Sequence, residues 1–224
     1  RESEYDVHRY YQHHDFRIGL GLSYLVELTK AMGVTSKLEA IQSFPLGTND
    51  VSVVEVAKVY QTLISGKTYK FYKEGSPNQV NFIRRIEDRY GNTLFEPERK
   101  EFQLVDRSYA LQMREILRMI VTNGTGRRAR GELFIELDKG KNPFQDKMAN
   151  KVSRIRIPAF GKTGTTNDYT NAYFAGFVPY PTEKNQPLDP ENSYVISAYV
   201  GYDLNKTMRA GYLRVSGAQG ALPV

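Results

Sequence analysis

The last third of the chain has the apolar period of β-strands. Apolar and polar residues alternate in three stretches: residues 154–165 (RIRIPAFGKTGT), 171–180 (NAYFAGFVPY) and 193–203 (SYVISAYVGYD). Alternation places successive side chains on opposite faces of a sheet. The short connections favour antiparallel pairing, because parallel neighbours need a long crossover. We therefore expect a three-stranded antiparallel sheet.

Helical patterns come before these strands. Apolar residues recur at helical spacing in residues 21–34, 52–66 and 106–124. Gly33, Gly66 and Gly124 stand where these helices would end. Helices first and strands last predict an α+β fold rather than alternating α/β units.

Three smaller patterns complete the expected organisation. Ser52-x-x-Glu55 has the form of a capping box, and Asp106 can cap the third helix. Residues 81–98 alternate around Gly91-Asn92, which predicts a strand pair across a turn. Residues 1–20 show no clear period, so we expect an irregular lead-in.

Composition limits the functional classes. With 224 residues and 40% hydrophobic residues, one globular domain is expected. Cysteine is absent, which excludes disulfides, thiolate catalysis and Cys-ligated metals. No stretch approaches the roughly 20 apolar residues of a spanning helix, so any membrane anchor should lie outside this chain. The start at Arg1 without Met indicates part of a longer protein.

The histidine and arginine clusters indicate neither a metal site nor a nucleic-acid-binding surface. The spacing of His8, His13 and His14 places no pair on one helix face, so no metal site is expected. The net charge of +6 is weak evidence for an acidic partner. Arg127, Arg128 and Arg130 are interpreted as a solvated basic loop rather than a nucleic-acid surface.

The triplet Gly-Lys-Thr occurs twice and raises the question of phosphate binding. A P-loop needs a Gly five residues before the triplet, so that the backbone N–H groups can turn toward the phosphates. That position is Arg156 for the triplet at Gly161 and Gln61 for the triplet at Gly66. Both nucleotide interpretations are therefore rejected. The overlapping Lys162-Thr163-Gly164 is instead a known part of serine acyl-enzyme sites.

The segment GKTGTTNDYTNAYFAGFVP resembles class A penicillin-binding proteins, with Tyr173 where that family usually has Trp. Four other segments resemble the family in the same order: SFPLGTNDVSVVEVAKVYQTLISG, TNGTGRRA, YVGYD and SGAQGALPV. The resemblance runs from about Gly21 to the end. It implies that residues 1–224 are the C-terminal portion of a transpeptidase domain, with 1–20 as a lead-in and 21–224 as the matching part.

The resemblance implies a fold and a chemistry. The fold would be an antiparallel sheet flanked by helices, as in β-lactamases and transpeptidases, incomplete at the N-terminus. The activity would be a serine-type D,D-transpeptidase that cross-links peptidoglycan stem peptides, binds β-lactams, needs no cofactor and works outside the bacterial cytoplasmic membrane. A D,D-carboxypeptidase, a β-lactamase or a degenerate wall-binding module remains the alternative. Gly124, Thr125 and Gly126 either only end a helix or take part in the site.

Five consecutive residues are the expected substrate contacts. Lys162 offers a positive charge, the hydroxyls of Thr163 and Thr165 can donate to a carboxylate, and Gly164 lets a substrate backbone approach. Thr166 is included as the next residue of the same segment. The resemblance also implies that the backbone N–H of Thr165 is an oxyanion-hole donor.

Two motifs of the family are not found. No Ser has a Lys three positions later, so the nucleophile is expected in a missing N-terminal part of the same protein, and this fragment alone is expected to be inactive. Ser76-Pro77-Asn78 is the only Ser-x-Asn. It lies after the 52–66 helix rather than before the 21–34 helix, and its composition is typical of a turn.

Overall fold

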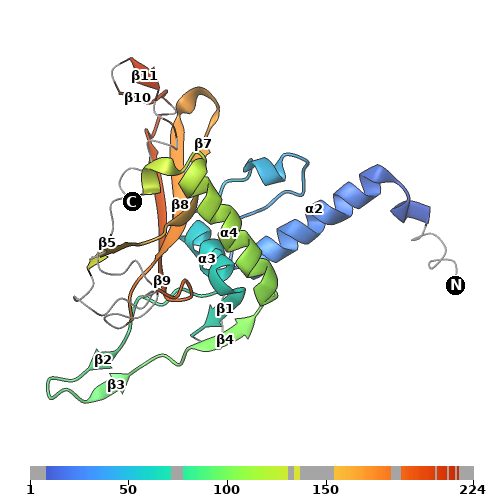
Figure 1. The fold of residues 1–224 in the computed structure, drawn as a ribbon. Helices are drawn as coiled ribbons and strands as arrows, with labels where there is room; N and C mark the ends of the chain where they lie inside the picture. Colours follow the sequence, from blue (N-terminus) through green and yellow to red (C-terminus); the bar gives the residue numbers. More distant parts are fainter. Residues whose placement is uncertain are drawn as a thin grey trace, which may run out of the picture. The chain divides into compact units, whose positions relative to one another are not determined.

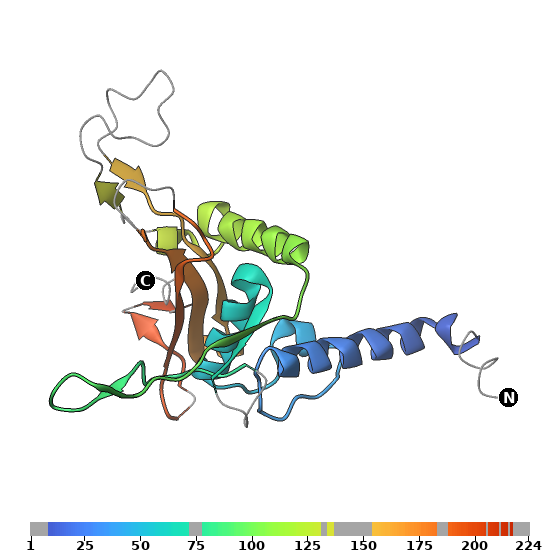
Figure 2. The ribbon, with the colours of Figure 1, turned by 90° about the horizontal axis from the view of Figure 1, so that it is seen from below.

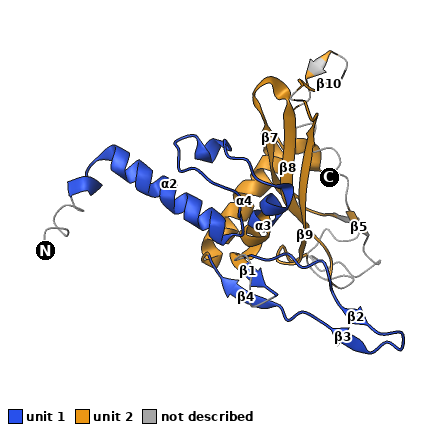
Figure 3. Ribbon diagram, turned by 180° about the vertical axis from the view of Figure 1, so that it is seen from behind, with its two compact units in different colours: residues 1–59, 68–104 blue, residues 60–67, 105–224 orange. Residues whose placement is uncertain are grey.

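The computed structural model describes residues 9–71, 78–130, 134–136, 154–182, 188–204, 206–210, 212–214 and 216. The chain forms two compact units, whereas its length and composition predict one domain (Figure 3). The first unit comprises residues 1–59 and 68–104, and the second comprises residues 60–67 and 105–224. Each unit has its own set of buried side chains, which explains the division.

The elements of the first unit are α2 (His14–Ala31), η1 (Phe44–Leu46), β2 (Ile86–Glu87), β3 (Thr93–Phe95) and β4 (Lys100–Gln103). Helix α3 (Val53–Ser65) and strand β1 (Lys67–Lys70) cross the boundary between the units. The second unit contains α4 (Arg107–Asn123), η2 (Arg127–Arg130), β5 (Phe134–Glu136), β6 (Arg154–Arg156), β7 (Phe160–Thr165), η3 (Asn167–Tyr169), β8 (Asn171–Pro179), β9 (Ser193–Gly201), β10 (Arg209–Ala210) and β11 (Leu213–Arg214) (Figure 1).

Helix α2 begins earlier than its sequence indicates. It starts at His14, so the prediction of an irregular segment is wrong for residues 14–20. Within the helix only Leu22 and Val26 are buried. A mostly exposed helix needs no continuous apolar stripe, which is why its first turns lack a helical period. The helix ends as predicted, with Gly33 in the left-handed region at φ 102°.

The capping box of α3 is confirmed and extends beyond the helix. The Ser52 N–H donates to Glu55 Oε2 at 2.8 Å, and the Glu55 N–H donates to Ser52 Oγ at 3.2 Å. The carboxylate of Glu55 also accepts from the N–H and hydroxyl groups of Thr35 and Ser36, at 2.7 to 2.9 Å. Burial alone would raise the pKa of Glu55, but these hydrogen bonds outweigh it and hold the pKa well below its ordinary value of 4.5.

Asn78 is a structural residue of the first unit. Its side chain is fully buried, and its amide donates to the carbonyl oxygens of Met32 and Lys58, both at 3.0 Å. Its Oδ1 accepts from the Tyr69 N–H at 3.1 Å. The other two residues of the Ser-x-Asn sequence, Ser76 and Pro77, lie outside the described residues. The amide of Asn78 is thus engaged in holding three backbone segments together.

Two short strand pairs lie in the first unit. Strands β2 and β3 pair antiparallel across the turn predicted at Gly91-Asn92, although they are shorter than the sequence pattern indicates. Asp88 organises that turn, because its carboxylate accepts from the N–H groups of Tyr90 and Asn92. Strand β4 pairs with β1, a contact that the sequence pattern does not predict.

The predicted antiparallel sheet is confirmed in the second unit. Its order is β7-β8-β9, with Thr163 opposite Phe174 and Ala175 opposite Ser197. The stretch 154–165 is two strands rather than one, because β6 pairs with β5 while β7 begins only at Phe160. Pro158 lies in the break and has no N–H for a ladder hydrogen bond.

The core of the second unit joins the sheet to α3 and α4. Phe160 and Phe177 stack with their ring centroids 4.7 Å apart. Ile64 of α3 and Leu117 of α4 pack against this pair. A second cluster comprises Val121, Ala129 and Phe174. Figures 1 and 2 show α4 running beside the sheet, and this combination of helices with an antiparallel sheet confirms the predicted α+β class.

The Glu55→Gln variant should be destabilised by about 2 to 3 kcal/mol, because an amide at this buried position cannot accept from all of the part-buried donors that the carboxylate binds. The lowered pKa of Glu55 means that its contribution is complete above pH 4.5 and declines as the pH falls below that value. Urea unfolding of both proteins at pH 7 and pH 3 measures this, and the difference should shrink at pH 3. The exposed Glu96→Gln is the control. Equal stability of Glu55→Gln and wild type at pH 7 would contradict the assignment.

The Gly176→Ala variant should be destabilised by about 3 kcal/mol or more. A Cβ at this position would lie 2.1 Å from the Phe160 carbonyl oxygen, so the backbone of β7 would have to move. Thermal unfolding followed by circular dichroism measures the loss. The matched control is Gly21→Ala in α2, which meets nothing within 4 Å and should gain about 0.5 to 1 kcal/mol. If the two variants melt alike, the close approach of the strands is not present.

Candidate functional site

Strand β7 carries most of the predicted site residues. It is an edge strand of the β7-β8-β9 sheet: among the described residues, β8 is its only neighbour in this sheet. Alternation along the strand puts Thr163 and Thr165 on one face and Lys162 on the other. The burial agrees for Thr163, which is 8% exposed, and for Lys162, which is exposed, whereas Thr165 at the end of the strand is exposed as well. The strand therefore separates the predicted cation from the predicted hydroxyl groups.

The hydroxyl groups line a shallow depression of about 580 Å³. Its lining comes from the segment after α4, from β7 and the turn that follows, and from one residue near the C-terminus: Thr125, Thr163, Thr165, Thr166, Asn167, Asp168, Tyr169 and Ser216. All of these residues are polar or bear a hydroxyl group. Such a surface can hold a polar or anionic group through several hydrogen bonds at once.

Thr125 joins the Gly-Thr-Gly segment to this site. Its hydroxyl lies 2.7 Å from the hydroxyl of Thr163, although 38 residues separate the two in sequence. Gly124 and Gly126 also end α4, because both of their N–H groups donate to the Ile120 carbonyl oxygen. The sequence left helix termination and participation in the site as alternatives. In the structure the two glycines end α4, and Thr125 between them lines the depression.

Lys162 and Gly164 are not part of the depression. The ammonium group of Lys162 donates to the Thr163 carbonyl oxygen at 2.6 Å. A Cβ on Gly164 would lie 3.2 Å from Cβ of Tyr173, its partner on β8. The absence of a side chain at Gly164 therefore already serves strand packing. Tyr173 in turn packs on Tyr199 of β9, with ring centroids 5.0 Å apart.

Thr166 lines the depression, but its hydroxyl also shapes the turn into β8. Its Oγ1 accepts from the Asn171 N–H at 2.8 Å and lies 2.9 Å from the hydroxyl of Thr170. The Tyr169 N–H donates to the Thr166 carbonyl oxygen. These contacts close the turn across η3.

The turn adds three residues that the sequence reasoning did not select. Asn167, Asp168 and Tyr169 line the depression beside Thr165. Asp168 and Tyr169 both have positive φ, 61° and 57°, which is uncommon for residues other than glycine. Tyr169 is held by Met208, whose N–H donates to its carbonyl oxygen, and by the guanidinium of Arg214, 5.4 Å from its ring. The Asn-Asp pair is a turn signal that could have indicated this loop.

The electrostatics of the depression differ from the expected site. Asp168 is the only charged residue among the described residues that line the depression, so none of these residues supplies a cation. Lys162 does not line the depression and lies on the other face of β7. Across the described residues no group of three or more His, Cys, Asp or Glu could hold a metal ion. The described helices are also too short or too polar to cross a membrane.

Comparisons with known proteins agree with the resemblance found in the sequence. No protein-family model matches the chain. Penicillin-binding protein 1A of Aquifex aeolicus is 28% identical over 205 residues, which is 92% of this chain and 22% of the relative. Penicillin-binding protein 1B of Haemophilus influenzae is 26% identical, covering 92% of this chain and 20% of the relative. Penicillin-binding protein 2D of Bacillus subtilis is 26% identical, covering 84% and 22%.

Among solved structures, the chain is similar to a crystal structure of the D,D-transpeptidase domain of a peptidoglycan glycosyltransferase from Eggerthella lenta. The TM-score is 0.49 with 16% identity, covering 90% of this chain and 46% of that structure. The chain spans about a fifth of the length of the curated relatives that it matches. Over about 92% of its length, this chain is therefore homologous to proteins named penicillin-binding protein 1A and 1B.

Proposed function

We propose that this chain is the C-terminal portion of the transpeptidase domain of a penicillin-binding protein. The whole protein would cross-link peptidoglycan stem peptides at the outer face of the bacterial cytoplasmic membrane. The observation that carries the proposal is the 2.7 Å contact between the Thr125 and Thr163 hydroxyls. It brings two segments that separately resemble the family into one depression. The homology along the chain supports the same assignment.

The proposed chemistry is acyl transfer through a serine that this chain does not contain. The serine oxygen attacks the carbonyl carbon of the penultimate D-Ala, and its proton passes to a base that is also outside the chain. The terminal D-Ala leaves as an amine after it gains a proton. An amine of a second stem peptide then attacks the ester carbonyl carbon, which releases the serine and forms the cross-link.

This chain would bind the donor peptide and stabilise the oxyanion. The hydroxyls of Thr163 and Thr165 would donate to the terminal carboxylate, and the Thr165 N–H would donate to the oxyanion of the tetrahedral intermediate. Lys162 would supply the positive charge, for which its ammonium must rotate away from the Thr163 carbonyl oxygen. The four-carbon stem of lysine permits that rotation.

Two neighbouring residues would act indirectly. Gly164 would allow the peptide to approach the strand, and Thr166 would hold the η3 turn in place through its contacts with Thr170 and Asn171.

The alternative activities would use the same binding residues: a D,D-carboxypeptidase or a β-lactamase would have water attack in place of the amine. Incubating the whole protein with a stem pentapeptide distinguishes them, because cross-linked dimers indicate transfer and free tetrapeptides indicate hydrolysis.

The whole protein should be labelled by a fluorescent penicillin, and Lys162→Ala should slow labelling by roughly 10 to 100-fold. Thr165→Pro removes the N–H proposed for the oxyanion and should slow labelling by about 100-fold or more. The rate of labelling on gels measures both. Thr165→Ala, which keeps the N–H, should lose less than Thr165→Pro.

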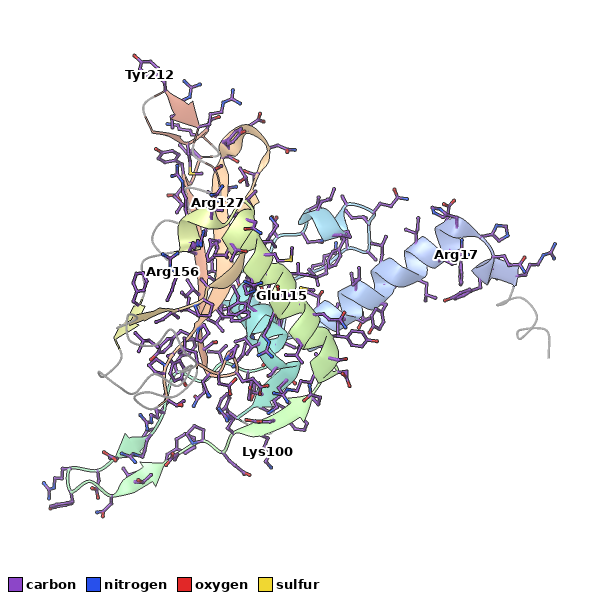
Figure 4. The ribbon with its side chains drawn as sticks, viewed as in Figure 1. Arg17, Lys100, Glu115, Arg127, Arg156 and Tyr212 are labelled. Atoms are coloured by element: carbon purple, nitrogen blue, oxygen red, sulfur yellow. The ribbon has the colours of Figure 1, made fainter. Side chains whose placement is uncertain are left out.

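The exposed Lys100→Ala on β4 is the control for Lys162→Ala (Figure 4). Unchanged labelling in both Lys162→Ala and Thr165→Pro, with both folded by circular dichroism, would refute the site. The isolated 224 residues should not be labelled, because they contain no Ser-x-x-Lys. Labelling of this piece would disprove the proposal that the nucleophile lies elsewhere.

Thr125→Val should slow penicillin labelling by about threefold to tenfold. Valine preserves the shape of the side chain but leaves the Thr163 hydroxyl without its partner, so that hydroxyl is held less firmly. Thr93→Val on the exposed strand β3 is the matched control. If both variants are labelled at the wild-type rate, the hydroxyl contact has no part in the reaction.

A further inference from the structure

A second depression lies in the second unit and shares no lining residue with the first. Its volume is about 170 Å³. The lining comes from α4, η2, β6 and the segment before β7: Arg118, Val121, Thr122, Arg130, Arg156, Ile157, Pro158 and Ala159. Arginine side chains thus border a depression whose floor, formed by Ile157, Pro158 and Ala159, is apolar. The site proposed for transpeptidation does not use this surface.

The arginines are held by well-packed neighbours. Arg130 directly follows Ala129, which is 4% exposed and packs with Val121 and Phe174. Arg156 ends β6, where it pairs with Phe134 of β5 and places its guanidinium 5.3 Å from that ring. Figure 4 labels Arg156 at this strand, Arg127 on η2 and Glu115 on α4. The cations that line the depression come from three separate elements: Arg118 from α4, Arg130 from η2 and Arg156 from β6.

The depression has an excess of positive charge. Arg118 is neutralised by Glu115 of the same helix, with hydrogen bonds of 2.6 and 2.8 Å between them. Within the described ranges, neither Arg130 nor Arg156 forms an ion pair with a carboxylate. With no carboxylate of the described residues paired to them, the two guanidinium groups around this small depression repel each other. An anion with about two negative charges would balance them.

We propose that this depression binds a phosphate-bearing ligand through Arg130 and Arg156. A phosphate monoester carries about 1.5 to 2 negative charges on a compact group, and its oxygens match the planar guanidinium fork. The volume of about 170 Å³ suits one phosphate or diphosphate group. The apolar floor of Ile157, Pro158 and Ala159 can contact a carbon chain attached to it. The phosphate comes either from a soluble phosphate ester or from a lipid headgroup.

Titration of pyrophosphate into the full 224-residue chain, by isothermal calorimetry in 150 mM NaCl, tests the proposal. We expect saturable binding that Arg130→Gln and Arg156→Gln each weaken about tenfold. Arg130→Lys keeps the positive charge but loses the planar guanidinium group that can bind two phosphate oxygens, so it should weaken binding less than Arg130→Gln. Arg89→Gln, in the turn between β2 and β3, removes the same charge elsewhere and should bind as wild type.

Sedimentation with vesicles distinguishes the two sources of phosphate. If the ligand is a lipid headgroup, phosphatidic acid vesicles should sediment the chain, pure phosphatidylcholine vesicles should not, and pyrophosphate should release it. If the source is soluble, pyrophosphate should bind without any sedimentation.

Three outcomes would overturn the proposal: no saturable binding of either probe, an equal loss in Arg89→Gln, or wild-type binding by a folded double variant Arg130→Gln, Arg156→Gln. If the glutamine variants do not fold, Arg130→Lys decides, because wild-type affinity in it would exclude the guanidinium fork. Penicillin labelling reports on the other depression, so failure there does not affect this result.

Discussion

The close approach of β7 and β8 at Gly161 and Gly176 is the constraint on which the second unit depends. A Cβ on Gly161 would lie 2.5 Å from the ring of Phe174, and one on Gly176 would meet the β7 backbone at 2.1 Å. Without side chains there, the strands pair continuously and the rings of Phe160 and Phe177 stack. This packing fixes β7 against α4, and hence positions Thr163.

The hydroxyl-lined depression follows from that packing. Once α4 is held against β7, the segment after the helix brings Thr125 to within 2.7 Å of Thr163. The same helix end leads into η2, whose Ala129 is buried while its arginines are exposed. One helix terminus therefore serves two surfaces of opposite character: a hydroxyl-rich depression with a single acidic residue, and an arginine-rimmed depression with an apolar floor.

Local sequence signals predicted the elements well. Asp106 caps α4 through the Ser108 N–H, and Ser52 and Glu55 close the box that begins α3, because both contacts involve residues within three positions of each other. The alternation in β7, β8 and β9 predicted the sheet and its antiparallel direction. For the elements, prediction failed in two places. The first turns of α2 carry no apolar period because the helix is mostly exposed, and the stretch 154–165 divides at Pro158 because β6 pairs with β5 rather than joining the β7-β8-β9 sheet.

The sequence by itself determined which chemical groups are present, such as the hydroxyls after Lys162 and the glycines that end helices. It also carried the resemblance to penicillin-binding proteins with which the homologues agree. Only the tertiary structure decided which of these groups meet. It brought the Thr125 hydroxyl to within 2.7 Å of the Thr163 hydroxyl, and it brought Arg130 and Arg156 to one depression. The physical reason is the separation in sequence of the residues that interact. Caps and strand alternation act between near neighbours in sequence, whereas these contacts depend on how α4 packs against the sheet.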